Sequence, residues 1–244
     1  MLGSDEAQKI TQTLIPDTWL SAQLGKPAFS LISPADLVAE ADFPDVPCFI
    51  SCRLEIGENR TLKRLTLLGF DLVCTQATYN LNTALISQRP KHIRFACTTD
   101  CDAIAKIAYE SFSFDRFHQD PQISDNVAST IKLNWAKSFF SGNRGDWLIV
   151  AHRNKQITGF AQLLLKDGKN LVIDLIAVDR EYQNQGIATE LIEFASNECL
   201  STVQSMIVGT QVANEGSCRL YQRLGFVEIS RYHMLHLHLP RLNK

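Results

Sequence analysis

The sequence predicts an α/β protein with a mixed, α+β type of sheet, and three patterns in its second half support this fold class. Residues 171–178 are rich in β-branched side chains and form a run too short for a typical helix. A loop containing Gly186 follows, and apolar side chains then recur at helical spacing from Ile187 to Cys199. A tight, glycine-containing loop is therefore expected to join a buried strand to a helix.

The first ninety residues contain a helix-to-strand pattern that recurs near the end of the chain. Residues 59–70 and 214–226 each begin with an asparagine suited to cap a helix, continue as an amphipathic helix and end in Leu-Gly-Phe. The glycine stands where a helix C-cap favours a left-handed residue. A strand is expected after each copy, at residues 71–79 and 227–239. Chance similarity and a repeated structural half both explain this pattern.

A domain boundary is expected at residues 89–92, where a proline between charged residues separates two strand-like stretches. The chain would then divide into a smaller domain at residues 1–90 and a larger one at residues 91–244. In the larger domain, Thr98 or Thr99 is expected to cap the first helix. A polar turn is expected to close a hairpin between the two strands that follow the second helix. The expected order of elements is strand 94–97, helices 100–112 and 126–140, strands 147–151, 157–165 and 171–178, the helix from Ile187, strand 207–211, helix 214–224 and strand 227–239.

The loop after strand 171–178 is the main candidate for a binding site. The first amides of a helix have no partner within the helix, and the helix dipole adds partial positive charge there, so anions bind such ends readily. Gly186 allows a ligand close to the backbone, and Ala188 adds almost no bulk. The residues expected to cup a pyrophosphate are Gln183, Asn184, Gln185, Gly186, Ile187 and Ala188. An ordinary strand-to-helix connection is the alternative, because short glycine motifs match by chance.

Composition and charge exclude several classes of protein. A chain of 244 residues with 45% hydrophobic residues can bury a sizeable core. Its formal net charge of -2 gives no electrostatic basis for binding nucleic acid. The seven cysteines include no Cys-x-x-Cys pair, which favours reduced thiols in a cytoplasmic protein. No apolar span of about 18 residues occurs, and Asp5 and Glu6 do not suit a signal peptide, so no membrane partner is expected.

Four residues around the glycine loop give a more specific match. Val178, Gln183, Gly186 and Ala188 follow the order Val, Gln or Arg, two residues, Gly, one residue, Gly or Ala. This order resembles motif A of the GNAT superfamily of N-acetyltransferases. Further on, residues 207–226 resemble the next strand and motif B of that family, including its tyrosine and its terminal Leu-Gly-Phe. The resemblance implies a GNAT fold that uses acetyl-CoA, preceded by a smaller, truncated GNAT-like N-terminal domain.

The resemblance also implies a reaction in which a primary amine attacks the acetyl thioester and CoA leaves as a thiolate. Tyr221, at the place of the motif B tyrosine, is the expected general acid. Backbone amides near Ile176 or Ala177 would stabilise the oxyanion if the strand ending at Val178 splays from its neighbour, as in the family. Asp174 is the candidate base, because an extended strand would place its side chain on the face of Ile176 and Val178. The alternative is that Asp174 binds a neighbouring donor.

The acceptor is predicted from residues 115–121, Asp-Arg-Phe-His-Gln-Asp-Pro. Together with Trp135 and the turn at residues 142–144, they resemble the dTDP-fucosamine acetyltransferase branch of the superfamily, which acetylates 4-amino-4,6-dideoxy sugars on nucleotide carriers. Arg116 is then expected to bind a nucleotide diphosphate, and His118 a sugar hydroxyl or the amine. Another small amine, such as an amino acid derivative or an antibiotic, is the alternative acceptor. A catalytically silent CoA-binding sensor is the alternative to an enzyme.

Motif B itself shows one departure from the pattern of this branch. A cationic residue commonly precedes the motif B tyrosine, but here Leu220 does, and Arg219 stands one residue earlier. One cofactor phosphate contact of the branch is therefore in doubt here. Asn214 has two expected roles that can hold together. The resemblance implies contact with the pantetheine or phosphate arm of CoA, and its position suits the N-cap of the following helix.

No metal site is expected. His236 and His238 would share a face of the last strand at metal-ligand spacing, but His233 would point the other way, so no third ligand is evident. The cysteines are expected in the core. The expected partner is a small-molecule amine, with a nucleotide-sugar favoured, and the sequence leaves open whether the chain forms a homodimer.

Overall fold

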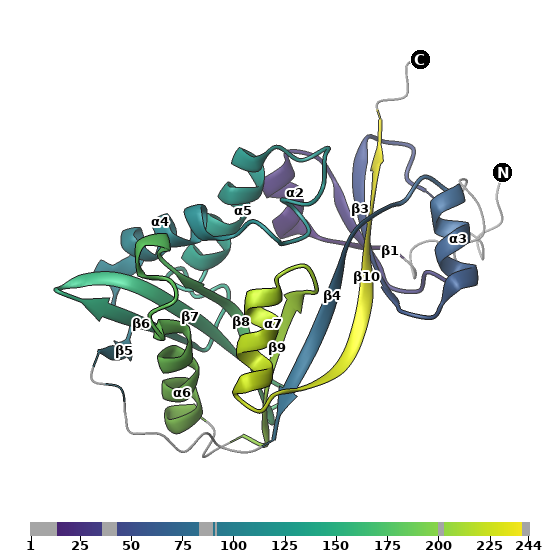
Figure 1. Ribbon diagram of the computed structural model, residues 1–244. Coiled ribbons are helices and arrows are strands. Elements are labelled where there is room, and N and C mark those ends of the chain that lie inside the picture. Colours follow the sequence, from purple (N-terminus) through teal and green to yellow (C-terminus); the bar gives the residue numbers. More distant parts are fainter. Residues whose placement is uncertain (1–13, 36–42, 83–89, 91, 200–202, 241–244) are drawn as a thin grey trace.

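The central element of the fold is a ten-stranded mixed sheet with strand order β1-β2-β3-β10-β4-β9-β8-β7-β6-β5 (Figure 1). The computed structural model describes residues 14–35, 43–82, 90, 92–199 and 203–240. In these residues the strands are β1 (Leu14–Pro16), β2 (Ala28–Leu31), β3 (Cys48–Glu55), β4 (Asp71–Leu81), β5 (Ile93–Phe95), β6 (Trp147–Arg153), β7 (Gln156–Lys166), β8 (Asn170–Val178), β9 (Ser205–Gln211) and β10 (Val227–Leu239). The helices are α2 (Thr18–Leu24), α3 (Asn59–Leu67), α4 (Cys101–Ser111), α5 (Asp125–Lys137), α6 (Ile187–Cys199) and α7 (Glu215–Arg223), with short 3-10 turns η2 (Thr98–Asp100) and η3 (Arg180–Tyr182).

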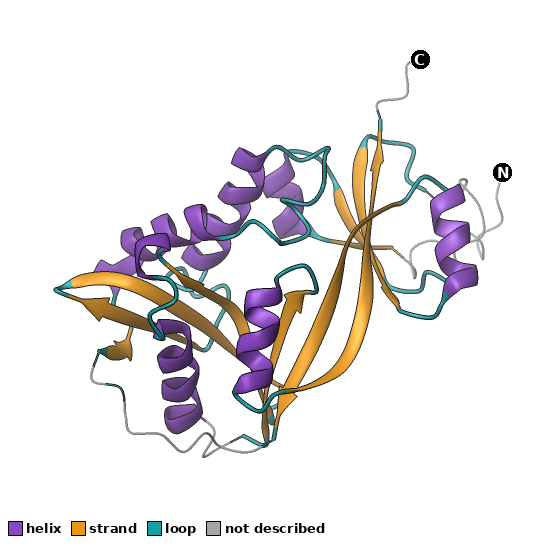
Figure 2. Cartoon of the chain, viewed as in Figure 1, coloured by secondary structure: helices purple, strands orange, loops and turns teal. Residues whose placement is uncertain are grey.

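Helices cover both faces of this sheet (Figure 2). On one face, α6 and α7 share a buried cluster with β8 and β9, and on the other, α4 and α5 share a second cluster with β7 and β8. Neighbouring residues of β6 alternate between these two clusters, since Ile149 belongs to the first and Leu148 to the second. A third cluster joins α2 to α5 through Leu20 and Ile131. The amino-terminal helix α2 therefore packs beside α5.

The amino- and carboxy-terminal parts of the chain share the sheet by interleaving their strands. The last strand, β10, lies antiparallel between β3 and β4, pairing Leu235 with Cys52 of β3 and Met234 with Cys74 of β4. In turn, β4 lies between β10 and β9. No break in the sheet therefore marks the expected boundary near residue 90, and the division into two domains stays a prediction.

The two copies of the helix-to-strand pattern end their helices in the same way. Gly69 and Gly225 have positive φ values of 90° and 86°. After each glycine, a phenylalanine amide returns to the helix: Phe70 donates to the Leu65 carbonyl, and Phe226 to the Tyr221 carbonyl, both at 3.0 Å. These are the features of a left-handed helix ending. The units β3-α3-β4 and β9-α7-β10 thus share local geometry as well as sequence.

The beginnings of these helices differ from each other and from expectation. Asn214 caps α7, with its side chain accepting from the Ser217 amide at 3.2 Å. Asn59, by contrast, is the first residue of α3, and the cap position belongs to Glu58, which makes no capping side-chain bond. The expected threonine cap near residue 98 is also wrong, because the turn η2 follows Cys97, whose amide donates to Asp100.

The hairpin between β6 and β7 is tighter than expected. Asn154 and Lys155 both take left-handed backbone, with φ of 49° and 67°, which suits a two-residue turn. Both strands therefore extend into residues 152–156, the polar segment that the sequence suggested as the turn. None of the helices in the described part of the chain combines the length and the apolar character needed to cross a membrane.

Candidate functional site

The site begins where the parallel strands β8 and β9 separate. They pair from Asn170 with Ser205 to Ile173 with Val208, and no further. Strand β8 nevertheless continues to Val178, held on its other side by β7, whose Gly159 pairs with Val178. From Asp174 onward the β9-facing edge of β8 is therefore unpaired in the described sheet. This is the splay on which the oxyanion expectation depended, and it leaves the backbone around Ile176 and Ala177 facing a gap.

The loop after β8 presents backbone amides to the same gap. Asn184 and Gly186 take left-handed backbone, with φ of 60° and 83°. The first amide that donates back along α6 is that of Glu190, which bonds the Gly186 carbonyl at 3.0 Å. In the described residues, the amides from Gln183 to Thr189 donate to no protein acceptor. They lie at the positive end of a 13-residue helix, so this segment has the features of an anion site.

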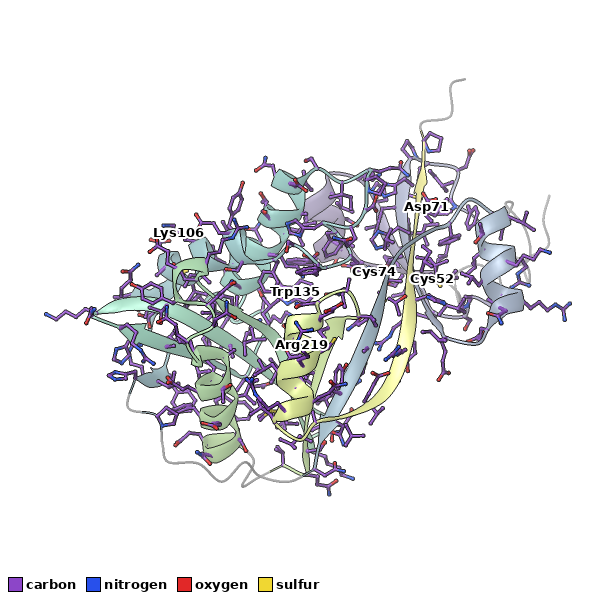
Figure 3. The ribbon with its side chains drawn as sticks, viewed as in Figure 1. Cys52, Asp71, Cys74, Lys106, Trp135 and Arg219 are labelled. Carbon is purple, nitrogen blue, oxygen red and sulfur yellow. The ribbon has the colours of Figure 1, made fainter. Side chains whose placement is uncertain are left out.

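A groove of about 950 Å³ connects this loop with the separated strands. The expected site residues that line it are Arg116, Asp174, Ile176, Ala177, Val178, Gln183, Asn184, Gly186, Ile187, Ala188, Asn214 and Tyr221. Gln185 does not line it, because its side chain turns back to donate to the Glu181 carbonyl at 3.1 Å. Trp135 of α5 and Arg219 of α7, labelled in Figure 3, line the groove from different helices. The groove thus brings most of the expected residues together.

Tyr221 lies on α7 at the wall of the groove and is only 2% exposed. Its ring packs against Tyr79 and Phe226, with centroids 5.8 and 5.7 Å away. Burial, followed by the nearby Cys218, raises the pKa of the Tyr221 hydroxyl well above its usual range, although a hydrogen bond with Ser217 lowers it. At neutral pH the phenol therefore keeps its proton, as a proton donor must.

Asp174 lies at a β-bulge, which changes the face that its side chain occupies. Ile173 pairs with Leu163 and Leu175 with Gln162, so Asp174 is the extra residue between two pairs. The predicted face is therefore wrong. Ile176 and Val178 pack against the α6 side of the sheet, whereas Asp174 points to the α5 side and accepts from Trp135. A single inserted residue shifts the two-residue period of the strand and reverses the face.

The Asp174 carboxylate is bound by four donors, three of them on Oδ2. Trp135 Nε1 donates to Oδ2 at 2.7 Å, and Gln162 Nε2 donates to the same oxygen at 3.3 Å. Arg144 binds both oxygens, through Nε at 2.7 Å and Nη2 at 2.6 Å. Three of these donors converge on Oδ2 and one binds Oδ1, so both oxygens are engaged by the protein. The geometry favours the alternative in which Asp174 holds its neighbours in position.

The two residues expected to bind the acceptor lie in different environments. Arg116 lines the groove, with its guanidinium 4.5 Å from the ring centre of Phe117. His118 does not line it: Nδ1 lies 2.5 Å from Asp115 Oδ2, and Nε2 lies 3.2 Å from Ser129 Oγ. Both nitrogens of this nearly buried ring are therefore engaged by the protein. The structure brings Arg116 to the groove but not His118.

His236 and His238 do share a face of β10, and Asp120 is a third group that the sequence did not reveal. Asp120 Oδ2 lies 2.6 Å from His236 Nδ1 and 2.8 Å from His238 Nε2. These three form a metal-type set of donors, but their separations are those of hydrogen bonds. The other ring nitrogens face cations, with Lys26 Nζ 3.1 Å from His238 and Arg116 Nη1 3.5 Å from His236. Such surroundings favour a hydrogen-bonded network over a divalent cation.

Lys132 is a groove residue that sequence reasoning missed. Its side chain is 8% exposed, and Nζ lies 3.7 Å from Asp115 Oδ1 and 4.9 Å from the ring centre of Trp135. Burial lowers the pKa of this amine, whereas Asp115 raises it. The helical spacing of α5 could have revealed that Lys132 is buried, because it falls on the same face of the helix as Ala128 and Ile131.

Comparisons with known proteins agree with this geometry. The family model described as "Acetyltransferase (GNAT) family" matches residues 102–226, slightly more than half of the chain. The spore coat polysaccharide biosynthesis protein SpsD of Bacillus subtilis is 33% identical over 142 residues, which cover 57% of this chain and 47% of that protein. The chain spans about half the length of the curated relatives it matches.

Two solved structures share the fold. A GCN5-related N-acetyltransferase from Kribbella flavida aligns with a TM-score of 0.56 at 13% identity, over 98% of this chain and 95% of that one. A tandem GNAT protein from the clavulanic acid biosynthesis pathway aligns with a TM-score of 0.51 at 11% identity, over 79% of this chain and 64% of that one. The predicted mixed-sheet GNAT fold is thereby confirmed.

Proposed function

The chain belongs to the acetyltransferase (GNAT) family, and we propose that it is an acetyl-CoA-dependent N-acetyltransferase that acts on a primary amine. One observation carries the proposal. The gap between β8 and β9 opens into a groove that has unbonded amides at one end and the buried Tyr221 in its wall. A thioester carried by a pyrophosphate needs an anion site and a place for its reacting carbon, and this groove offers both.

The amides from Gln183 to Ala188 would bind the pyrophosphate of CoA, and the pantetheine arm would lie in the gap between the strands. Asn214 lines the same groove, so its side chain can contact the arm while it caps α7. Arg219 lines the groove one residue before the usual cationic position and is held by Glu215 at 2.9 Å. An exposed arginine there can still reach a terminal phosphate.

The chemistry would use these groups in order. The neutral amine attacks the acetyl carbon to form the C–N bond, and amides near Ile176 and Ala177 stabilise the oxyanion. The C–S bond then breaks, and Tyr221 gives its proton to the thiolate. A thiol pKa of about 8.5 and a tyrosine pKa of about 10 already make this transfer uphill by about 2 kcal/mol, and burial widens the difference. Proton transfer is therefore expected to accompany C–S cleavage.

For the acceptor, we propose a nucleotide-linked 4-amino-4,6-dideoxy sugar. The similarity to a spore coat polysaccharide biosynthesis protein supports a sugar, and the half-buried Arg116 in the groove supports an anionic carrier. A sugar amine beside electronegative oxygens is less basic than a lysine amine, so water can accept its proton. A dedicated base is then unnecessary, which agrees with the binding of both Asp174 oxygens by Arg144.

The cellular setting is also a proposal. The cysteines of the chain form no disulfide in the described residues, which supports the cytoplasm as the place where nucleotide-sugars are handled. The partner would be a small-molecule amine, and sedimentation would decide between a monomer and the homodimer that the sequence left open.

Turnover with a panel of amines tests the proposal. The full chain is incubated with acetyl-CoA and nucleotide-linked amino sugars, free amino sugars, amino acids or aminoglycosides, and acetylated products are identified by mass spectrometry. Acetylation of a nucleotide-linked amino sugar is the expected result. Turnover of only another small amine would disprove the nucleotide-sugar as acceptor and support the small-amine alternative. Acetyl-CoA binding without transfer to any amine would favour the sensor alternative.

A further inference from the structure

A second cavity adjoins the groove and has no role in the steps above. Its volume is about 340 Å³, and its walls come from α2 on one side and from α5 with its neighbouring loops on the other. Arg116, Phe117 and Trp135 line both hollows, so the cavity opens at the acceptor end of the groove. Part of this cavity is therefore built by the amino-terminal residues that precede the family match.

Arg116 forms the shared wall and lacks a charged partner. In the described residues it makes no ion pair, and its one polar contact, to His236 Nε2, is long at 3.5 Å. Burial lowers the pKa of the Arg116 guanidinium, and Asp17 raises it from a distance. A half-buried cation without an ion-pair partner is stabilised when an anion binds it. The wall between the two hollows thus suits a phosphate group.

Trp19 gives the cavity an exposed aromatic face. Its side chain is 36% exposed, and its ring meets Trp135 edge to face, with centroids 5.8 Å apart and planes at 70°. Trp135 is itself fixed, because Nε1 donates to Asp174 at 2.7 Å and the Arg144 guanidinium lies 4.7 Å from its ring. The ring of Trp19 is therefore supported from behind and free to stack with a flat ligand.

A carboxylate completes the polar lining. Asp17 caps α2 by accepting from the Leu20 amide at 2.8 Å, and the residue also lines the cavity. Such a group repels a bare phosphate but accepts hydrogen bonds from sugar hydroxyls. Along the cavity, then, an aromatic face, a hydroxyl acceptor and an unpaired cation adjoin one another. These are the groups that recognise a base, a pentose and a phosphate.

From this arrangement we infer that the second cavity binds the nucleoside diphosphate part of the acceptor, with the base stacked on Trp19 and a phosphate on Arg116. The inference rests on the proposed function, because the amino sugar would then extend past Arg116 into the groove. It also gives α2 a function: the amino-terminal segment supplies the selectivity for the carrier of the amine.

Calorimetric titration of the full chain with UDP, dTDP and inorganic pyrophosphate, without acetyl-CoA, tests this inference. Trp19→Leu should weaken both nucleotides roughly tenfold, in keeping with the usual strength of base stacking, and leave pyrophosphate unchanged. Arg116→Gln should weaken all three ligands. Trp19→Phe should retain most of the affinity. Trp147→Phe changes a partly buried tryptophan of β6 that lies outside the cavity, and should retain all of it.

Three results would overturn the inference: no nucleotide binding to the wild type, equal nucleotide affinity of wild type and Trp19→Leu, or pyrophosphate binding as tight as that of the nucleotides. An unchanged acetyl-CoA affinity of Trp19→Leu checks that the variant is folded. The outcome is separable from that of the proposed function. Acetylation of free amines without nucleotide binding would disprove this subsite alone. Nucleotide binding without acetylation would disprove the proposed enzymatic activity but not the subsite.

Discussion

Arg144 binds both carboxylate oxygens of Asp174, with Nε 2.7 Å from Oδ2 and Nη2 2.6 Å from Oδ1. The pair joins the turn after α5 to the bulge of β8, at the point where β8 leaves β9. Trp135 is held by the same carboxylate. This ion pair therefore helps to connect α5 and the turn after it to β8 at one wall of the groove.

Asp174→Asn should test whether this carboxylate positions its neighbours or acts as a base. Loss of the charge-assisted bonds is expected to lower the free energy of unfolding by about 2 kcal/mol. This value already allows for solvent screening, because the Arg144 side chain is 43% exposed. If Asp174 positions its neighbours, Asp174→Asn and Arg144→Gln should reduce kcat/KM for the acceptor by similar factors. The double variant should then be no worse than Asp174→Asn. Steady-state kinetics and urea unfolding measure both effects.

A base role predicts a different pattern for the same variants. Arg144→Gln would then stay close to wild type, whereas Asp174→Asn would lose nearly all transfer. That result would show that Asp174 acts as the general base.

Tyr221→Phe should reduce the transfer rate about 10²–10⁴-fold while leaving acetyl-CoA affinity unchanged. The phenol is buried, holds its proton at neutral pH and lines the groove, so removing the hydroxyl removes the donor but not the packing. Tyr232→Phe, on β10 beside Arg53, is the matched control and should turn over normally. Equal turnover of wild type and Tyr221→Phe would refute the acid role.

Gly186→Val should raise the dissociation constant for acetyl-CoA tenfold or more, by roughly 1.4 kcal/mol. Gly186 has φ of 83° and open space where a side chain would project, so a larger residue both strains the loop and occupies ligand space. Gly168→Val is the matched control, because Gly168 also has positive φ and open space but lies in the turn before β8. It should lose similar stability and bind acetyl-CoA normally; equal weakening of binding in both variants would count against the loop as the site.

His236 should make the protein sensitive to acid. Burial lowers the pKa of His236 to about 4, and Arg116 and His238 act in the same direction, against the hydrogen bond with Asp120. Between about pH 4 and pH 6.5 the unfolded chain binds more protons than the folded one at this position. Stability is therefore complete above this window and is lost as pH falls through it, by about 3 kcal/mol in total.

Urea unfolding between pH 4 and pH 7 measures that loss. His236→Asn should flatten the dependence on pH, whereas His92→Asn, which removes an exposed histidine, should keep it. Identical pH profiles for wild type and His236→Asn would show that the acid sensitivity lies elsewhere. Asp120 keeps its charge through the window, because hydrogen bonds from His236 and His238 outweigh burial and hold its pKa below the usual range.

Features that depend on neighbouring residues were predictable from the sequence. The strand before Val178, the loop at Gly186 and the helix from Ile187 follow from local periodicity and from the backbone freedom of glycine. The Leu-Gly-Phe endings at Gly69 and Gly225 were equally local. Each of these features occurs in the structure where the sequence indicated it.

Features that depend on distant residues were not predictable. The bulge at Asp174 reverses a face through one extra residue, and nothing in the sequence of β8 marks it. Asp120 meets His236 and His238 only because β10 returns through the sheet to the loop after α4. The cavity beside Trp19 likewise needs the packing of α2 on α5. Single-strand periodicity carries no information on such contacts.

Hydrogen exchange of the backbone amides from Gln183 to Thr189, with and without acetyl-CoA, tests the central claim most directly. These amides have no protein acceptor in the described structure and are proposed to bind the pyrophosphate of the cofactor. At saturating acetyl-CoA, their exchange should slow strongly, while the turn at Gly168 should exchange as before. Saturable acetyl-CoA binding with unchanged exchange at residues 183–189 would place the cofactor elsewhere and contradict the account.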